Sequence, residues 1–337
     1  MVQKPVTSIE VAQLAGVSQP TVSRAFDPEA SVAPETRARV LAAAHKLGYQ
    51  PNVIARSLST QRTNIVGLVM ANLTNSQFYP VVLDAFTERL QAVGKQTLLF
   101  NAAPDRPVDE ILPRILGYRV DALVIVSTTP SSEIIDECTQ TGTPVILFNR
   151  FAPETSANSI CCDNVAGGRR VADLLLDAGH ERIAYLAGIA STATNSMREK
   201  GFSDRLRERG YGRPLREQGA YTYESGLAAT RRLLALSTPP DAIFCAADIM
   251  ALGAIDAARQ AGLSIPDDLS IVGFDDIPVA GWPAYDLTTI RQPIAQMVAT
   301  AVALIAAAEP DSGQTHLLPG ELIRRGSVRS NHGNQTS

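Results

Sequence analysis

Residues 7–24 read TSIEVAQLAGVSQPTVSR and predict two short helices joined by a tight turn. Thr7 and Glu10 follow the capping-box pattern, in which a hydroxyl and a carboxylate satisfy the first backbone amides of a helix. Gly16 stands where a residue of positive φ ends a helix most easily. Three apolar residues are expected to form the inner face of the first helix: Val11, Leu14 and Ala15.

The second helix is expected to begin after Ser18, whose side chain can cap it, and its first turn tolerates Pro20. Two helices in this arrangement form a helix-turn-helix, whose second helix enters the major groove of DNA. An ordinary helical hairpin is the structural alternative. Side chains of this surface can contact base edges or phosphates, and we predict DNA contacts at Thr7, Ser18, Gln19, Pro20, Thr21, Ser23 and Arg24.

A third helix is predicted to open at Pro34 and to end at Gly48. After it, Asn52 to Leu58 is long enough for about two helical turns. A helix that short is marginal by itself in water. We therefore expect this segment to become helical only when it has a partner.

The distribution of charge separates this N-terminal region from the rest of the chain. The 337 residues carry a formal net charge of -4, which taken alone argues against a nucleic-acid protein. The first 62 residues hold seven Lys and Arg and four Asp and Glu, a net of +3, and the remainder carries -7. A basic head on an acidic body indicates a nucleic-acid module at the N-terminus.

Composition excludes several other classes of protein. The four cysteines form no C-x-x-C pair and no metal-ligand spacing with the four histidines, so we expect no metal site and no disulfide framework, as in a reduced cytoplasmic chain. The longest apolar run, residues 297–308, is shorter than the roughly 20 residues that span a bilayer. The N-terminus lacks a signal-peptide pattern. These features predict a cytoplasmic protein that does not associate with membranes.

From Ile65 onward, continuous apolar runs alternate with helical patterns, which is typical of doubly wound parallel sheets. The number of runs indicates two lobes. The predicted strands are residues 65–70, 97–100, 122–126, 144–148, 159–162, 182–186, 241–245 and 270–274.

Three of these runs end on a carboxylate: Asp163, Asp248 and Asp275. Ligands of such folds bind beyond the carboxyl ends of the strands, and a carboxylate there can accept two hydroxyl hydrogen bonds, which suits a sugar. Asp163 and Asp248 also have a structural reading, because each precedes or opens a predicted helix and could cap it. Asp276 is read as a loop or hinge residue.

Three motifs of the head, residues 11–24, 32–37 and 47–58, make the chain resemble the lactose and galactose repressor (LacI/GalR) family. Further motifs, among them residues 162–168, 179–183, 244–248, 272–276, 287–293 and 322–325, extend the resemblance over nearly the whole chain. It implies a helix-turn-helix head at 1–50, a hinge helix at 51–62 and a two-lobed periplasmic-binding-protein-like body at 63–330. The polar end at 331–337 is expected to be a disordered tail. By analogy, the first lobe comprises about 64–163 with 294–318, and the second about 164–292 with 321–329.

In that family the hinge helix forms on the operator, pairs with its dimer mate and pushes a leucine into the minor groove. The resemblance assigns this wedge to Leu58 and the small residue beside it to Ala55, and it adds DNA contacts at Asn52 and Arg56. Leu58 as a packing residue in a linker is the alternative. The pair Gln19-Pro20 departs from the family, whose members commonly carry two hydrogen-bonding residues there.

The resemblance also implies which residues meet an effector. Arg198 matches a position that contacts effector, and its fork could bind vicinal oxygens or a carboxylate. Phe78 and Tyr221 match positions that stack on or line the ligand, with core packing as their alternative reading. Thr194 is expected to be a weaker polar contact, and Trp282, the only tryptophan, to form a wall of the site.

These features together predict a homodimeric transcriptional regulator, specifically a repressor, that binds a near-palindromic operator and responds to a sugar or sugar acid. No cofactor, metal or catalytic residue is expected. A Rossmann-like enzyme is the rival, but the chain has no G-x-G-x-x-G, P-loop or G-x-S-x-G motif. A sugar-binding protein or sensor without operator control shares the body, but the helical head argues against it.

Overall fold

A computed structural model describes residues 6–27, 30–50, 62–71, 77–102, 108–126, 130–151, 155–307 and 313–330. The chain divides into two compact units, Met1–Thr63 and Asn64–Ser337. The predicted hinge contacts Asn52, Ala55, Arg56 and Leu58, and the predicted tail, lie outside the described residues. Within the described ranges no helix is long and apolar enough to span a bilayer.

The first unit contains three helices: α1 (Ser8–Ala15), α2 (Gln19–Ala25) and α3 (Pro34–Leu47). The predicted capping box is present, since the Thr7 amide donates to Glu10 Oε2 at 2.7 Å and the Glu10 amide to Thr7 Oγ1 at 3.4 Å. Gly16 and Gly48 end α1 and α3 with φ of 64° and 65°. The small core contains Val11, Ala12, Ala15, Val22, Ala25, Val40, Ala43 and Ala44.

Two expectations for the head were wrong. Leu14 is 46% exposed, because the buried face of α1 is centred on Val11, Ala12 and Ala15 and Leu14 lies about 100° around the helix from that centre. Ser18 occupies the N-cap position of α2, but its side chain makes no cap hydrogen bond. Its Oγ instead lies 2.8 Å from Thr21 Oγ1, so the two hydroxyls satisfy each other.

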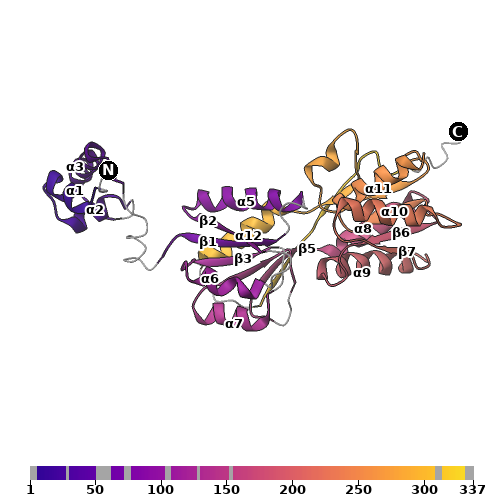
Figure 1. The fold of residues 1–337 in the computed structure, drawn as a ribbon, viewed down its shortest axis with the longest axis horizontal. Coiled ribbons are helices and arrows are strands. Elements are labelled where there is room, and N and C mark those ends of the chain that lie inside the picture. Colours follow the sequence, from indigo (N-terminus) through magenta and orange to yellow (C-terminus); the bar gives the residue numbers. More distant parts are fainter. Residues whose placement is uncertain are drawn as a thin grey trace. The chain divides into compact units, whose positions relative to one another are not determined.

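The first lobe of the body is built on a six-stranded parallel sheet in the order β11-β5-β4-β3-β1-β2. Helices α5 (Phe78–Ala92) and α12 (Ile294–Ala307) pack together on one face, with α6 (Leu112–Leu116), α7 (Ser132–Gln140) and the short η1 (Val108–Glu110) on the other (Figure 1). The strands are β1 (Ile65–Ala71), β2 (Gln96–Ala102), β3 (Ala122–Ile125), β4 (Val145–Phe148), β5 (Asn158–Cys162) and β11 (Thr315–Leu318).

The second lobe is built on a four-stranded parallel sheet in the order β7-β6-β8-β9. Its strands are β6 (Ile183–Ala187), β7 (Leu215–Gln218), β8 (Ala242–Cys245) and β9 (Ser270–Val272), and its helices are α8 (Asn164–Asp177), α9 (Ala193–Glu208), α10 (Tyr223–Leu234), α11 (Asp248–Gln260) and the short η2 (Pro278–Gly281). The eight predicted strands are confirmed. The sequence did not indicate β7, because this edge strand, Leu-Arg-Glu-Gln, is largely exposed and lacks an apolar run.

Two further strands, β10 (Thr289–Arg291) and β12 (Glu321–Ile323), form a separate antiparallel pair. β10 leads from the second lobe into α12, and β12 follows β11, the edge strand of the first sheet. Together with the passage from β5 into α8, they are the places where the chain crosses between lobes. The segment near Leu322 therefore pairs with β10 and not with the four-stranded sheet.

Both sheets reverse their strand order once, between β1 and β3 in the first lobe and between β6 and β8 in the second. In open α/β sheets the ligand lies beyond the carboxyl ends of the strands at such a reversal. The topology therefore directs attention to the carboxyl ends of the strands of both sheets, and first to those beside the reversals, β1, β3, β6 and β8.

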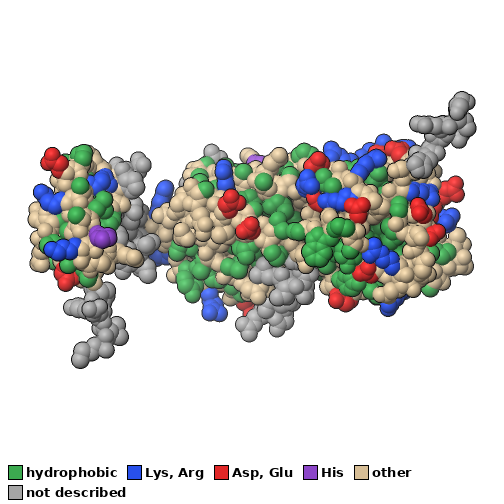
Figure 2. All heavy atoms as spheres, turned by 90° about the horizontal axis from the view of Figure 1, so that it is seen from above, with side chains coloured by type: hydrophobic (Ala, Val, Ile, Leu, Met, Phe, Trp, Pro, Cys, Tyr) green, Lys and Arg blue, Asp and Glu red, His purple; other side chains and the backbone are tan. Residues whose placement is uncertain are grey.

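The surface of the second lobe carries basic and acidic side chains in alternation (Figure 2). Many are paired across helices, for example Arg205 with Asp173 at 2.8 Å and Arg209 with Asp177 at 2.9 Å. Exposed ion pairs of this kind contribute little to stability, because water and salt screen the charges. They therefore do not explain the stability of the lobe.

Helices α8 and α9 approach each other at two glycines. A Cβ at Gly168 would overlap the backbone of Arg198 and Phe202, and a Cβ at Gly201 would overlap the backbone of Val165. Gly226 and Gly253 bring α10 and α11 together in the same way. Because Arg198 lies at the first of these crossings, the glycines also set the position of its side chain.

Replacing Gly168 by alanine should destabilise the body by about 1–3 kcal/mol or more, because the added methyl meets backbone atoms that cannot rotate away. Urea unfolding followed by circular dichroism measures this change. Gly212→Ala is the matched control, since a Cβ there has nothing within 4 Å and φ is not positive. Equal stability of the two variants would show that the helices do not need the close crossing.

His180 is buried where α8 gives way to β6, with Nδ1 3.5 Å from Asp241 Oδ1. Burial and the nearby Arg329 guanidinium together lower the pKa of His180 to about 4, although Asp241 opposes both effects. Folding therefore favours the neutral imidazole. The resulting stabilisation is complete above the unfolded pKa of about 6.5, is lost progressively as the pH falls below it, and is fully lost once the pH has fallen through 4.

The protein should accordingly lose about 2 kcal/mol of unfolding free energy through His180 between pH 7 and pH 5. His180→Gln cannot take up this proton, so its unfolding free energy should fall less over the same interval. Guanidinium unfolding of both proteins at each pH measures the difference. Parallel pH profiles would show that His180 is not buried in its neutral form.

Candidate functional site

The second lobe contains a buried arginine whose guanidinium is held on several sides. Arg198 is 2% exposed, donates from Nε to Asn164 Oδ1 at 2.8 Å and from Nη1 to the Ala246 carbonyl, and lies over the Phe274 ring at 3.7 Å. Asn164 is itself fixed by a bond from Nδ2 to the Cys162 carbonyl at 2.9 Å. The remaining nitrogen, Nη2, lies 3.4 Å from Asp275 Oδ1.

Asp275 follows β9 and has φ of 128°. Its amide donates to the Ile290 carbonyl at 2.8 Å, and Oδ1 accepts from Gln292 Nε2 at 2.7 Å. Burial raises the pKa of Asp275, while Arg198 and Gln292 oppose that rise. Hydrogen bonds from the described residues reach only Oδ1. The carboxylate therefore presents Oδ2 as an acceptor beside the Arg198 donor.

Residues of the first lobe face this pair. Burial raises the pKa of the Tyr79 hydroxyl, the positive charge of Arg150 and a hydrogen bond with it oppose the rise, and Asp275 and Tyr221 reinforce it. Tyr79 is on α5 and Arg150 follows β4, whereas Asp275 and Tyr221 belong to the second lobe. Charged and polar groups of the two lobes therefore come within electrostatic range of each other at Tyr79.

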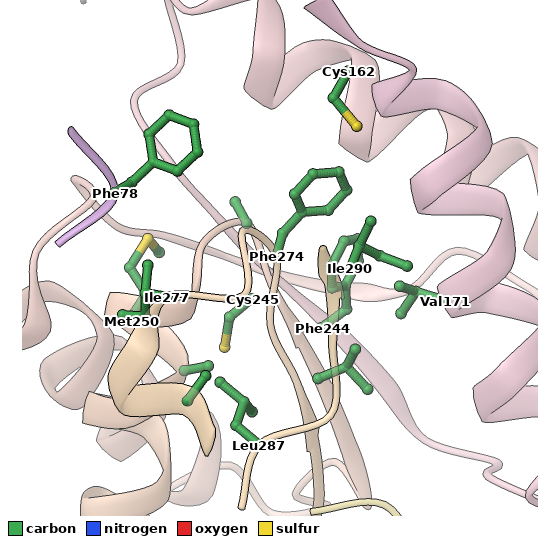
Figure 3. Close-up of a cluster of buried hydrophobic side chains, with 14 of the residues drawn as sticks. Phe78, Cys162, Val171, Phe244, Cys245, Met250, Phe274, Ile277, Leu287 and Ile290 are labelled. Carbon is green, nitrogen blue, oxygen red and sulfur yellow. The ribbon is translucent and has the colours of Figure 1, made fainter. Parts of the chain in front are cut away.

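Aromatic side chains border the same site. Phe78 is 5% exposed, and its ring lies 5.6 Å from that of Tyr79 in an edge-on arrangement. Figure 3 shows Phe78 and Phe274 as members of one hydrophobic cluster. The Tyr221 ring covers Gly188, where any Cβ would overlap it, and its hydroxyl is 3.3 Å from Thr192 Oγ1. Tyr221 has φ of 58°, so the backbone orients this ring.

The remaining predicted effector residues lie as follows. Asp163 caps α8, accepting from the Ala166 amide at 2.9 Å, as its structural reading predicted. Thr194 is 6% exposed on α9. Trp282 follows η2 and is 56% exposed, and no described ring or ion pair of the site contacts it.

Asp248 is fully buried inside the second lobe. Oδ1 accepts from the Thr289 hydroxyl at 2.5 Å and Oδ2 from the Ile277 amide at 2.9 Å. Burial raises its pKa, and Asp275 adds to the rise. The expected capping role was wrong, because Ala247 is the N-cap of α11 and Asp248 is already helical. Through Oδ2 this carboxylate ties the loop after β9 to α11, and through Oδ1 it ties the start of β10 to α11.

Four polar residues of this region were not predicted from the sequence: Tyr79, Arg150, Asn164 and Gln292. Arg150 and its neighbour Asn149 had a usable signal, since they follow Phe148 at the end of an apolar strand just as Asp275 follows Phe274. Asn149 is 6% exposed, and its Oδ1 has no hydrogen-bond partner among the described residues. Such a buried acceptor is expensive unless a ligand or water satisfies it.

The predicted DNA-binding face of the head is largely exposed. Gln19, Pro20, Ser23 and Arg24 lie on the outside of α2, and Thr21 is half-buried against Ser18. Gln19 Nε2 donates to Ser8 Oγ at 3.1 Å, which holds this side chain across the turn. Thr7 is exposed at the start of α1.

A helix-turn-helix head on a two-lobed body with a polar site between its lobes defines an effector-controlled DNA-binding regulator. Residues 9–52 match the model for bacterial regulatory proteins of the lacI family, and residues 172–328 match the periplasmic binding protein-like domain. The transcriptional regulator GalS of Salmonella typhimurium is 35% identical over 332 residues, 96% of each chain. The chain therefore belongs to the lacI family of bacterial transcriptional regulators.

Other relatives agree with this assignment. The probable repressor ExuR of Bacillus subtilis is 30% identical over 96% of this chain and 98% of its own. The Lac repressor dimer bound to operator matches with a TM-score of 0.87 and 27% identity over 97% of this chain and all of the other. A CelR–cellobiose complex matches with a TM-score of 0.71 and 30% identity, covering 96% and 99% of the two chains. The predicted fold and the predicted role in transcription regulation are thus confirmed.

Proposed function

We propose that this regulator binds a sugar or sugar acid between its lobes and, as a homodimer in the cytoplasm, represses transcription from a near-palindromic operator without any catalytic step. The observation that carries the proposal is the Arg198–Asp275 pair, which lies beyond the carboxyl end of β9 and whose carboxylate acts electrostatically on Tyr79 of the other lobe. CelR, which has been solved with cellobiose, is a relative with a similar body.

The chemistry of the pair suits a polyhydroxylated ligand. Asp275 Oδ2 accepts a hydroxyl hydrogen bond and the Arg198 fork donates to a neighbouring oxygen, so the two together read vicinal hydroxyls. The faces of Phe78 and Tyr221 provide apolar surface for the carbon side of a sugar ring. Arg150 provides the counter-charge that a sugar acid requires. Asp163 and Thr194 are secondary contacts in this proposal, whereas Asp248 and Trp282 have no direct part.

Asp275→Asn should weaken sugar binding at least tenfold, about 1.4 kcal/mol, because an amide has only one acceptor oxygen and no negative charge to balance Arg198. The measurement is a thermal-shift titration of the full chain with D-galactose, D-glucose, D-ribose, cellobiose and D-galacturonate. Asp267→Asn, an exposed carboxylate in a loop, is the control and should match the parent. Unchanged affinity in Asp275→Asn would exclude this pocket.

On the DNA side, we propose that α2 reads the operator and that Leu58 enters the minor groove from a hinge helix. Arg24→Ala and Leu58→Ala should each lower operator affinity at least tenfold in gel shifts, whereas Arg207→Ala, an exposed arginine of the body, should not. Affinity of the parent should also fall steeply with salt, because phosphate contacts release counterions. A flat salt dependence, or undiminished binding by Leu58→Ala, would contradict the respective contact.

A further inference from the structure

The residue after Asp275 holds the two crossing strands together. The Asp276 side chain is 7% exposed, and each of its oxygens accepts from a different arginine. Oδ2 accepts from Arg291 Nε at 2.7 Å and Oδ1 from Arg325 Nη2 at 2.7 Å. Arg291 ends β10, and Arg325 follows β12.

These strands carry the chain between the lobes. β10 leads into α12, which packs against α5 of the first lobe, and β12 continues from β11 of the first sheet. They pair with each other from Thr289 opposite Ile323 to Arg291 opposite Glu321. A single carboxylate therefore fixes both crossings to the loop that follows β9.

The loop after β9 and the end of β10 also meet at the effector site. Asp275 accepts from Gln292, and the neighbouring Asp276 accepts from the neighbouring Arg291. The Asp275 amide donates to the Ile290 carbonyl at 2.8 Å, which holds the segments in register. Asp275 and Asp276 have φ of 128° and 56°, a region that non-glycine residues rarely adopt, so the loop is held by its partners and not by backbone preference.

We propose that Asp276 is the positioning residue that couples occupancy of the effector site to the arrangement of the two lobes. A ligand that hydrogen-bonds to Asp275 shifts the adjacent Asp276. Because Asp276 is bonded to Arg291 and Arg325, the shift is passed to both crossing strands. The change in operator affinity on effector binding is then a coupling free energy between the effector site and the DNA-binding head. The inference rests on the proposed function in one respect: the effector must engage Asp275.

The first test needs no ligand. Hydrogen exchange of the full chain is followed by mass spectrometry in the parent, Asp276→Asn and Glu321→Gln. Glu321 is the matched control, because it contacts the same Arg291 at 3.3 Å but is 68% exposed. Amides of residues 289–291 and 321–323 should exchange at least about tenfold faster in Asp276→Asn and unchanged in Glu321→Gln. Equal exchange in Asp276→Asn and the parent would overturn the proposal.

The second test measures coupling, using whichever sugar of the panel above stabilises the parent most. In Asp276→Asn the Kd for this sugar should stay within threefold of the parent, while the ratio of operator affinities with and without sugar should shrink at least fivefold. A residue that is merely structural would lower Tm and leave this ratio intact, and that result would overturn the proposal. If no panel sugar binds the parent, the sugar assignment fails, and the exchange experiment alone decides the role of Asp276.

Discussion

The body depends on the burial of one cation, the Arg198 guanidinium. A buried charge is strongly unfavourable unless hydrogen bonds and a counter-charge satisfy it. Here Asn164, the Ala246 carbonyl and the Phe274 ring hold the guanidinium, and Asp275 supplies the negative charge. A ligand that moves the Asp275 carboxylate therefore removes the counter-charge of a buried guanidinium, and the surrounding residues must adjust to satisfy it.

The fold around this ion pair provides the precision that the pair needs. The glycines at the α8–α9 crossing bring the Arg198 backbone against α8, and α8 carries Asn164 at its first turn. Asp275 lies in the loop that follows β9. Gln292, the residue after β10, donates a hydrogen bond to the same carboxylate. The partners come from α8, the residues after β8, the loop after β9 and the residue after β10, so the site forms only when these parts of the chain are folded together.

Much of this was readable from the sequence, and the misses have physical reasons. Apolar runs predicted the buried strands, because strands of a parallel sheet that is covered on both faces need apolar side chains on both sides. The edge strand β7 was not predicted, because it is largely exposed and has no apolar run. Asp275 was found because it ends an apolar run. Asp248 ends one too, yet its oxygens bond within the lobe, since a strand-end position does not reveal which way a side chain points. Tyr79 gave no signal at all, because its role arises from contact with the other lobe.

A crystal structure of the protein with the sugar that stabilises it most would show directly whether Asp275 and Arg198 bind the effector. One sugar hydroxyl should lie about 3 Å from Asp275 Oδ2 and a neighbouring sugar oxygen about 3 Å from the Arg198 guanidinium. A sugar bound elsewhere, with Asp275 and Arg198 contacting only protein atoms, would contradict this assignment.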